Sequence, residues 1–391
     1  QYMYPYFKRD LDSAKITKKR AQELLECLFI KVRQRLYLLE YRGARRIVSV
    51  RTNDKVTFSG VDANGQDATN ELSFMLLEAH AHCHLDEPVL SFRMHKNTPD
   101  DILKATLEVI RLGTGIPHIL NDEAIVPSLM GRGVSLAEAR NYADIGCQEN
   151  VTDPSTCGAD TNPRSNAGWF NLAKIVEFVL YNGVDRLSGK QSGPQTGDPR
   201  DFSSMDEFFE AVKRQLEYAV YVNCIYNNLM DWAFANYHPS PVLDLLHPGP
   251  RQRGIDYSNG GCKYNWTGAI AVGLGTAADS LAAIEHLVYD TKEITIDQLI
   301  KALDSNWVGY EDTRQKCRRA PKYGNDDDYA DKWAVRMSSA WMDEYEKHRT
   351  PKGGIFVGGF FSMTTYVFIG SETWATPKRL VLNEPEKVIK A

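Results

Sequence analysis

The sequence has no long apolar run, no block of like charge and no leader-like start. Its apolar stretches, such as residues 268–274, are far shorter than the roughly 20 residues that a membrane span requires. The net charge is −5 with both signs mixed along the chain, so neither nucleic acid nor an anionic membrane is an expected partner. The opening residues lack the basic and apolar segments of a secretory signal. We therefore expect a cytoplasmic protein.

Cysteine is sparse and unpatterned. The chain has seven cysteines, an odd number, and none forms a C-x-x-C pair. This pattern favours free thiols in a reducing compartment over a disulfide framework. The segment 80–84 (HAHCH) gathers possible metal ligands, but no second pair of ligands at a suitable spacing lies elsewhere. We interpret these histidines as surface residues at a helix end and expect no bound metal.

The chain has the composition of an ordinary globular protein. Its hydrophobic residues follow a helical spacing in some segments and a strand-like spacing in others. Hydrophobic residues make up 43% and charged residues 25%, values typical of a folded soluble domain. Stripes at helical spacing alternate with short strand-like runs, which predicts an α/β architecture with a mostly parallel sheet or barrel. The predicted helices cover residues 16–35, 70–80, 100–113, 135–142, 171–182, 205–234, 276–290, 296–305 and 326–345. The predicted strands cover 47–50, 56–58, 89–94, 116–120, 142–147, 264–272 and 355–369.

The best candidate for a chemical site is the segment Gly146-Cys147-Gln148-Glu149, where an apolar strand ends. A cysteine nucleophile needs a neighbouring histidine or a helix N-terminus, whereas a carboxylate two residues away disfavours the thiolate. Two interpretations stay open from these residues. Cys147 is either a buried residue that closes a strand beside a solvated Glu149, or one half of a thiol and carboxylate pair that carries chemistry.

A second candidate is Gly273-Leu-Gly275-Thr-Ala-Ala278, which follows an apolar strand and opens a helix like a dinucleotide fingerprint. The acidic residue about 20 positions further on is Asp297, which lies at a predicted helix start instead of a strand end. Close packing of a strand and a helix accounts for these glycines better than a phosphate site. An NAD-binding oxidoreductase remains an alternative function.

Several further motifs follow one another along nearly the whole chain. They are 60–72 (GVDANGQDATNEL), 93–99 (RMHKNTP), 132–143 (RGVSLAEARNYA), 146–149 (GCQE), 264–268 (YNWTG) and 374–377 (WATP). Together they resemble the glycyl radical enzymes of the pyruvate formate-lyase superfamily. The resemblance implies a ten-stranded α/β barrel, with residues 1–391 forming the central and C-terminal part of a single barrel domain. Inside such a barrel a cysteine loop meets a loop that carries a glycine radical.

The resemblance also implies the roles of two residues. Cys147 corresponds to the cysteine whose thiyl radical takes a hydrogen atom from a small organic substrate, and this chemistry does not need a thiolate. Glu149 corresponds to the base of the eliminating and decarboxylating branches. The implied activity is a lyase that breaks a C–O, C–N or C–C bond in anaerobic metabolism. The implied partners are a radical S-adenosylmethionine activating enzyme and a second copy in a homodimer.

Two segments of the superfamily pattern are missing from this chain. The C-terminal Arg-Val-Ser/Ala-Gly-Tyr motif is absent, and Val357-Gly-Gly-Phe360 resembles it only in part and lies too far upstream. The N-terminal part of the barrel has no counterpart either. We therefore expect the glycyl radical to lie on sequence absent here and the chain alone to be inactive, with no cofactor bound in it. A catalytically dead fragment or scaffold subunit is an alternative.

The expected pocket differs from that of the diol dehydratases. Asn166 stands where those enzymes bring an Asp and arylacetate decarboxylases bring a His, and Arg164 in the same loop is either a fork for a carboxylate or a surface residue. Trp266 and Ile270 belong to a strand that lines the pocket in this superfamily. Because a Trp with an Ile four residues on is similar to the fumarate-adding enzymes such as benzylsuccinate synthase, fumarate addition is a further alternative.

Overall fold

The computed structural model of the chain describes residues 2–35, 54–146, 149–152, 168–360 and 366–378. The chain divides into two compact units. Unit 1 contains residues 1–160 and 246–249, and unit 2 contains residues 161–245 and 250–391. Each unit holds a parallel three-stranded sheet with helices packed on it, in agreement with the predicted α/β class. Within the described ranges, no helix is long and apolar enough to span a bilayer.

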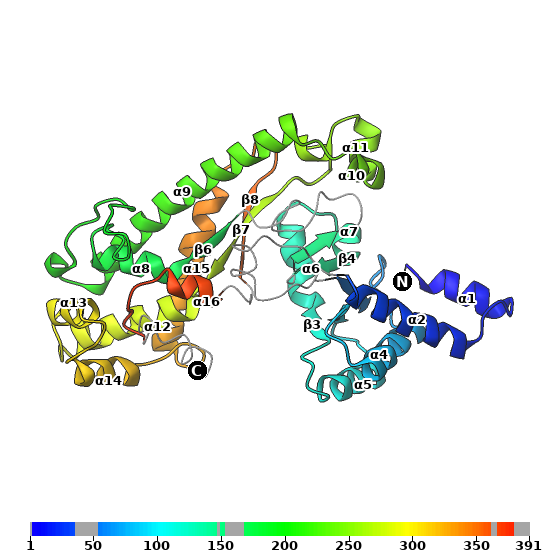
Figure 1. The fold of residues 1–391 in the computed structure, drawn as a ribbon, viewed down its shortest axis with the longest axis horizontal. Helices are drawn as coiled ribbons and strands as arrows, with labels where there is room; N and C mark the ends of the chain where they lie inside the picture. The colour runs from blue at the N-terminus through cyan, green and yellow to red at the C-terminus, as the bar shows by residue number, and fades with distance from the viewer. Residues whose placement is uncertain (1, 36–53, 147–148, 153–167, 361–365, 379–391) are drawn as a thin grey trace. The chain divides into compact units, whose positions relative to one another are not determined.

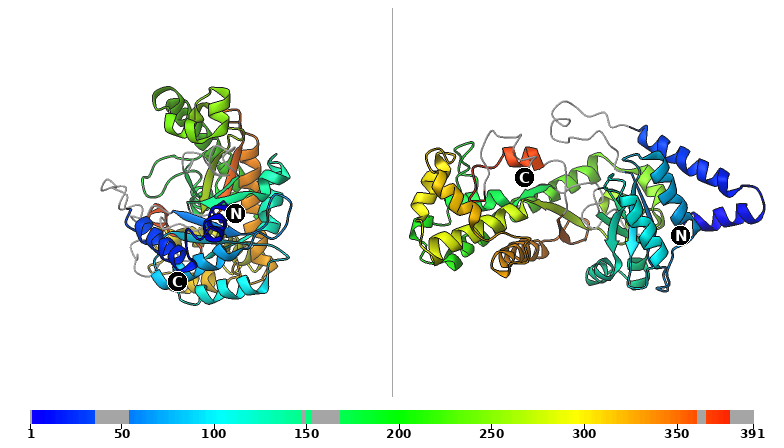
Figure 2. Two further views of the ribbon diagram at one scale, coloured as in Figure 1. Left: turned by 90° about the vertical axis from the view of Figure 1, so that its right-hand side faces the viewer. Right: turned by 90° about the horizontal axis from the view of Figure 1, so that it is seen from below.

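Unit 1 contains a parallel sheet with helices beside it and a separate two-stranded hairpin (Figure 1). Its helices are α1 (Tyr4–Asp12), α2 (Lys18–Arg33), α4 (Glu71–Cys83), α5 (Asp100–Ile110), α6 (Asp122–Gly131) and α7 (Leu136–Arg140). Its strands are β1 (Lys55–Ser59), β2 (Val89–Met94), β3 (His118–Asn121), β4 (Tyr142–Ile145) and β5 (Glu149–Thr152). Thr17 caps α2 and Asn70 caps α4, which fixes where these two helices begin. Helices α1 and α2 follow one another across a short turn (Figure 2, right).

The two faces of the β1-β2-β3 sheet differ in character. Phe58 and Phe92 are paired in register, and their rings pack with centroids 5.4 Å apart against buried residues of α4 and α5 such as Leu77 and Ile102. Side chains alternate between the faces of a strand, so Ser91, one residue before Phe92, belongs to the opposite face. That opposite face is polar and buried, with Ser91 and Arg93 0% and 3% exposed.

Unit 2 repeats the arrangement with a larger helical core. Its strands are β6 (Trp169–Asn171), β7 (Thr267–Val272) and β8 (Phe356–Phe360), which pair in that order and all run parallel. Its helices are α8 (Leu172–Leu180), α9 (Met205–Tyr237), α10 (Pro241–Leu246), α11 (Pro248–Arg253), α12 (Leu274–Ile284), α13 (Ile296–Asp304), α14 (Glu311–Arg319), α15 (Asp328–Glu346) and α16 (Tyr366–Ser371), with three short turns η1 (Pro199–Asp201), η2 (Tyr257–Asn259) and η3 (Glu285–Asp290). Helix α9 is 33 residues long. Figures 1 and 2 show it as one continuous helix.

The core of unit 2 lies between the sheet and helices α8, α12 and α15. Ala269 and Ala271 of β7 are buried in this core, and Trp341 of α15 is fully buried against Phe360. Gly358 of β8 makes the close approach possible, because a Cβ there would lie 2.4 Å from the Trp341 ring. Gly358 therefore has a packing role in β8, which explains this glycine of the 357–360 segment without radical chemistry.

Most predicted elements are confirmed, and three expectations are wrong. The strand predicted over 355–369 ends at Phe360, and the described residues 366–371 form helix α16 instead. Cys262 is disulfide-bonded, so the expectation of free thiols holds only for Cys27, Cys83, Cys224 and Cys317 among the described cysteines. His80 is buried and not a surface residue. The strand predicted over 47–50 lies outside the described residues.

Candidate functional site

The candidate site is carried by an antiparallel hairpin of unit 1. Strand β4 pairs with β5, and Ile145 lies opposite Glu149 at the last rung before the turn. Gly146 begins the turn with φ of +56°, in the left-handed region that favours glycine. Cys147 lies outside the described residues, between two segments whose positions are known. The strand predicted up to residue 147 is therefore confirmed as far as Ile145.

Glu149 is placed directly over the backbone of Gly146. A Cβ atom at Gly146 would lie 2.8 Å from Oε2 of Glu149, inside van der Waals contact. A side chain at position 146 would require the Glu149 carboxylate to move from this position. The glycine of the GCQE motif thus has a structural reason, which is to let the Glu149 carboxylate fold back over the turn.

The hairpin rests on the polar face of the parallel sheet through Asp144. Thr57, Ser91 and His118 are direct neighbours on β1, β2 and β3 and form a row across this face. The Asp144 carboxylate accepts hydrogen bonds from Thr57 Oγ1 at 3.0 Å and Ser91 Oγ at 2.9 Å. Lys55 Nζ lies 2.5 Å from Asp144 Oδ2, and the two side chains are 2% and 0% exposed.

His118 on β3 is the last residue of this row, next to Ser91 on β2. Its Nδ1 lies 3.3 Å from Lys55 Nζ. Burial lowers the pKa of the His118 imidazole, and the nearby Lys55 charge lowers it further. A neutral imidazole can accept a hydrogen bond from the ammonium, whereas a protonated one would repel it. The cluster therefore holds one cation, Lys55, one anion, Asp144, and a neutral histidine.

A second buried ion pair holds the beginning of β4. Arg93 of β2 forms a bidentate pair with Asp122, with nitrogen to oxygen distances of 3.0 and 2.8 Å. Arg93 also donates to the Tyr142 carbonyl at 3.0 Å, and its guanidinium lies 4.1 Å from the centroid of the Tyr142 ring. The Tyr142 hydroxyl donates to Asp122 at 2.8 Å. Both ends of β4 are thus tied to the sheet by charged groups.

The remaining predicted site residues belong to unit 2 or lie outside the described residues. Trp266 is buried beside Tyr264, with ring centroids 5.7 Å apart, and directly precedes β7. Ile270 of β7 is 1% exposed, and by strand alternation it faces away from the helical core that holds Ala269. Trp266 and Ile270 therefore share the strand face opposite Ala269, and both side chains are buried there. Arg164 and Asn166 lie outside the described residues.

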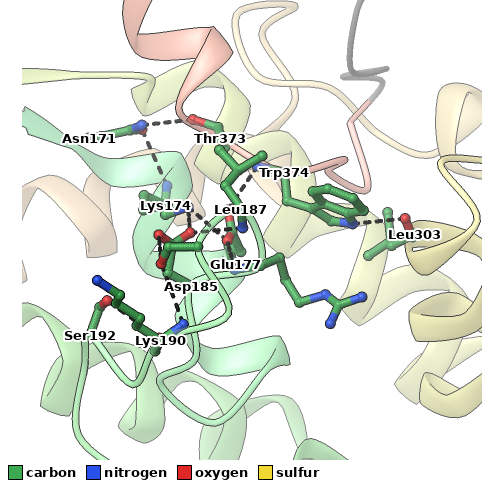
Figure 3. A network of polar contacts seen from close by, with 12 residues as sticks. Asn171, Lys174, Glu177, Asp185, Leu187, Lys190, Ser192, Leu303, Thr373 and Trp374 are labelled. Carbon is green, nitrogen blue, oxygen red and sulfur yellow. Dashed lines mark hydrogen bonds and ion pairs between the residues drawn. The ribbon is translucent and has the colours of Figure 1, made fainter.

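The segment that carries the WATP motif is fastened to helix α8 by a polar network (Figure 3). Glu177, with its side chain 1% exposed, accepts hydrogen bonds from the backbone of Trp374 at 2.9 Å and from Lys174 Nζ at 2.8 Å. Asn171, at the end of β6, donates to Thr373 Oγ1 at 2.7 Å. Since Asn171 also caps α8, one residue links the strand, the helix and this segment.

The other motifs have structural explanations. Among the described residues, no group of three or more His, Cys, Asp or Glu side chains is arranged to hold a metal ion. Gly273 forms the left-handed turn between β7 and α12, where a Cβ would approach Ala173 of α8 to 3.4 Å. Asp297 lies in the first turn of α13 and pairs with Arg200 and Lys301. The dinucleotide alternative therefore lacks its acidic residue at a strand end.

A family profile described as pyruvate formate lyase-like matches residues 1–370. The chain belongs to this family. Membership confirms the resemblance carried by the GCQE and neighbouring motifs.

Named relatives in the family are dehydratases and lyases. The chain is 34% identical to trans-4-hydroxy-L-proline dehydratase of Clostridioides difficile over 394 residues, covering 98% of this chain and 48% of the relative. It is 34% identical to (2S)-3-sulfopropanediol dehydratase of Klebsiella oxytoca, covering 96% and 45%. The glycerol-bound glycerol dehydratase of Clostridium butyricum superposes with a TM-score of 0.90 at 35% identity, covering 97% and 47%. The chain thus spans about half the length of the relatives it matches.

Sequence reasoning missed the residues that hold the hairpin. Lys55, Arg93 and Asp144 are charged residues in strands with buried side chains. Arg93 and Asp144 each interrupt an otherwise apolar or alternating run, whereas Lys55 begins its strand. That interruption is the signal that could have found Arg93 and Asp144, because a charge in a buried strand needs a partner. It does not identify the partner.

Proposed function

We propose that the intact protein is a glycyl radical lyase in which Cys147 and Glu149 are the catalytic residues. Family membership supports radical chemistry, since the chain also matches the glycyl radical subunit of 4-hydroxyphenylacetate decarboxylase of Clostridioides difficile. The observation that carries the proposal is the position of Glu149. Its carboxylate folds over Gly146, next to Cys147 in the chain, on a hairpin laid against the polar face of a parallel sheet.

In the proposed reaction the Cys147 sulfur, as a thiyl radical, takes a hydrogen atom from a hydroxyl-bearing carbon of the substrate. The C–H bond breaks homolytically, an S–H bond forms, and the unpaired electron stays on that carbon. The Glu149 carboxylate then takes the hydroxyl proton while a group on the neighbouring carbon leaves with its bonding electron pair. The product radical takes a hydrogen atom back from Cys147, which restores the thiyl radical.

The radical is supplied from a glycine on sequence outside this chain, installed by a radical S-adenosylmethionine activating enzyme, in an intact protein that forms a homodimer. The residues of this chain bind substrate and exclude water. Buried Trp266 and Ile270 suit the second task, because both side chains are apolar and almost fully buried. Water exclusion protects a radical from quenching and strengthens the polar contacts to substrate.

We further propose that the substrate is small and anionic. The named substrates of two relatives, hydroxyproline and isethionate, carry a carboxylate and a sulfonate. Arg164 lies in the loop that follows the GCQE motif, and a guanidinium forms bidentate bonds with such groups. Asn166 replaces the acidic residue of the diol dehydratases, which removes a negative charge that would repel an anion.

The test is a substrate panel with the intact enzyme, activated under anaerobic conditions. The panel contains small hydroxylated carboxylates, hydroxylated sulfonates, neutral diols, and a hydrocarbon with fumarate. The proposal expects loss of water, ammonia or sulfite from one of the anionic substrates, detected by mass spectrometry. A product with the summed mass of hydrocarbon and fumarate would establish the adding reaction instead. Absence of turnover in an enzyme that carries the radical would contradict the lyase assignment.

Arg164 gives a separate test of the substrate class. Arg164→Ala should raise KM for an anionic substrate much more than kcat changes, because the side chain is proposed to bind without reacting. A charged fork contributes roughly 1.5–3 kcal/mol, which corresponds to a rise of about tenfold or more. An equal KM for wild type and variant would show that Arg164 does not contact the anion.

A further inference from the structure

Stability alone does not explain why Lys55 and Asp144 form a buried ion pair. Taking a carboxylate and an ammonium out of water costs much of what their attraction returns, and apolar residues of similar size often serve stability as well. Here the pair is nearly unexposed and draws in two further donors, Thr57 and Ser91. Hydrogen bonds are directional, whereas apolar contacts are not. Each donor of the cluster therefore fixes where the acceptor must lie.

The donors define the place of Asp144 from two strands. Lys55 and Thr57 stand two residues apart on the same face of β1, and Ser91 stands opposite Thr57 on β2. The backbone of Asp144 adds a fourth contact, its N–H donating to Thr57 Oγ1 at 3.2 Å. A shift of β4 along the sheet would break these contacts together. The position of the hairpin is thus set at Asp144 with little freedom.

Asp144 lies close along the hairpin to Gly146 and Glu149, so its position affects theirs directly. Asp144 pairs with Asn150 across the hairpin, and the next rung pairs Ile145 with Glu149. Gly146 follows two residues after Asp144 and carries the Glu149 carboxylate over its backbone. Between the fixed carboxylate and the candidate catalytic residues there are only one rung and one turn residue. A displacement at Asp144 therefore reaches the turn with little chain to absorb it.

We propose that Asp144 is a positioning residue, whose carboxylate, held by Lys55, Thr57 and Ser91, sets where Gly146 and Glu149 lie on the sheet. The proposal rests on the proposed function, because that function makes the place of the turn matter for rate. Hydrogen transfer requires reacting atoms within about 3–3.5 Å, and a misplacement of about 1 Å can lower the rate about a hundredfold. Asp144 touches no substrate and acts only through the hairpin.

The test compares three variants of the intact enzyme with wild type. Asp144→Asn removes the charge and keeps the shape. A double variant, Lys55→Met with Asp144→Leu, replaces the pair with apolar groups. Ile102→Ala, in the helical layer on the other face of the sheet, destabilises unit 1 without touching the hairpin. For each we would measure the unfolding temperature, kcat and KM, the glycyl radical signal, and hydrogen exchange in the peptide 142–152.

The proposal expects Asp144→Asn to lower kcat by about tenfold or more, with KM and radical content within about twofold and faster exchange in 142–152. The double variant should have a higher unfolding temperature than Asp144→Asn but an equally low kcat. Ile102→Ala should have a lower unfolding temperature than wild type but an unchanged kcat. The proposal is overturned if kcat follows unfolding temperature through all three variants, or if exchange in 142–152 is unchanged in Asp144→Asn. Failure of the proposed function would be recognised separately, by turnover that survives Cys147→Ser, and the exchange measurement would still decide the role of Asp144.

Discussion

The Glu149 carboxylate occupies the space in which a side chain of Gly146 would stand, 2.8 Å from the ideal Cβ position. The same glycine has φ of +56°. A residue with a Cβ at position 146 therefore meets both backbone strain and a collision with a carboxylate. The strain and the collision can be separated, because other glycines of unit 1 have a positive φ but no atom close to the ideal Cβ position.

Gly146→Ala is expected to lower turnover of the intact enzyme by about tenfold or more, because the added methyl displaces the Glu149 carboxylate. The strain alone costs about 1 kcal/mol. The matched control is Gly133→Ala, since Gly133 has φ of +87° and no atom within 4 Å of its ideal Cβ. Steady-state kinetics and thermal unfolding of both variants check the prediction. Equal losses of activity in the two variants would contradict the proposed role of the Gly146 contact.

Glu149→Gln is expected to lower kcat by roughly a hundredfold or more, because an amide keeps the shape of the side chain but cannot accept the proton. KM should change little, since the variant still occupies the same volume. The control is Glu108→Gln near the C-terminal end of α5, where the exposed Glu108 side chain pairs with Arg111. Near wild-type turnover in Glu149→Gln, with the radical signal present, would remove Glu149 from the mechanism.

Gly358→Ala tests the packing role assigned to the 357–360 segment. A Cβ at Gly358 would lie 2.4 Å from the Trp341 ring, and overpacking of this kind costs about 1–3 kcal/mol. We expect a lower midpoint of urea unfolding for unit 2. Gly370→Ala, in helix α16 with open space around the glycine, should leave the midpoint unchanged or raise it. A Gly358→Ala variant as stable as wild type would show that Trp341 yields without cost.

His80 and His82 are expected to contribute to stability with opposite dependence on pH. Burial lowers the pKa of His80, so the unfolded chain takes up its proton first and stability falls as pH drops below about 6.5. A hydrogen bond to Glu26 raises the pKa of His82, so its contribution is present at low pH and is lost as pH rises through the folded value.

Urea unfolding between pH 5 and pH 8 distinguishes the two histidines. His80→Gln should flatten the loss of stability on acidification, and His82→Gln should steepen it. The same change of slope in both variants would contradict the assigned environments, in which His80 bonds Thr114 at 3.0 Å and His82 bonds Glu26 at 2.8 Å.

The secondary structure could largely be predicted because it depends on local patterns. Strand β2 has the bounds that its apolar run predicts, and α2 begins after the Thr17 cap. Helix α16 differs from the prediction, which is a strand over residues 355–369. Its Tyr-Val-Phe-Ile run has strand propensity, yet the Ile369 carbonyl accepts from Thr373 Oγ1 at 3.0 Å and from Asn171 at 3.4 Å. Contacts from the rest of the chain therefore stabilise a helix end that local preference disfavours.

The candidate site could be predicted only in part. Motif resemblance pointed to Glu149, and strand alternation explains the buried face shared by Trp266 and Ile270. The partners of Asp144 could not be predicted, since Lys55 lies 89 residues away in the sequence and Ser91 lies 53 away. Hydrophobic periodicity assigns a residue to a face but carries no information on which distant charge will meet it there.

The most direct test of the radical mechanism is Cys147→Ser in the intact, anaerobically activated enzyme. Electron paramagnetic resonance reports the glycyl radical, and product formation reports turnover in the same sample. The account predicts an unchanged radical signal and no detectable turnover, because a serine O–H bond is too strong to relay the hydrogen atom. Turnover close to wild type in that variant would contradict the assignment of Cys147 as the residue that attacks the substrate.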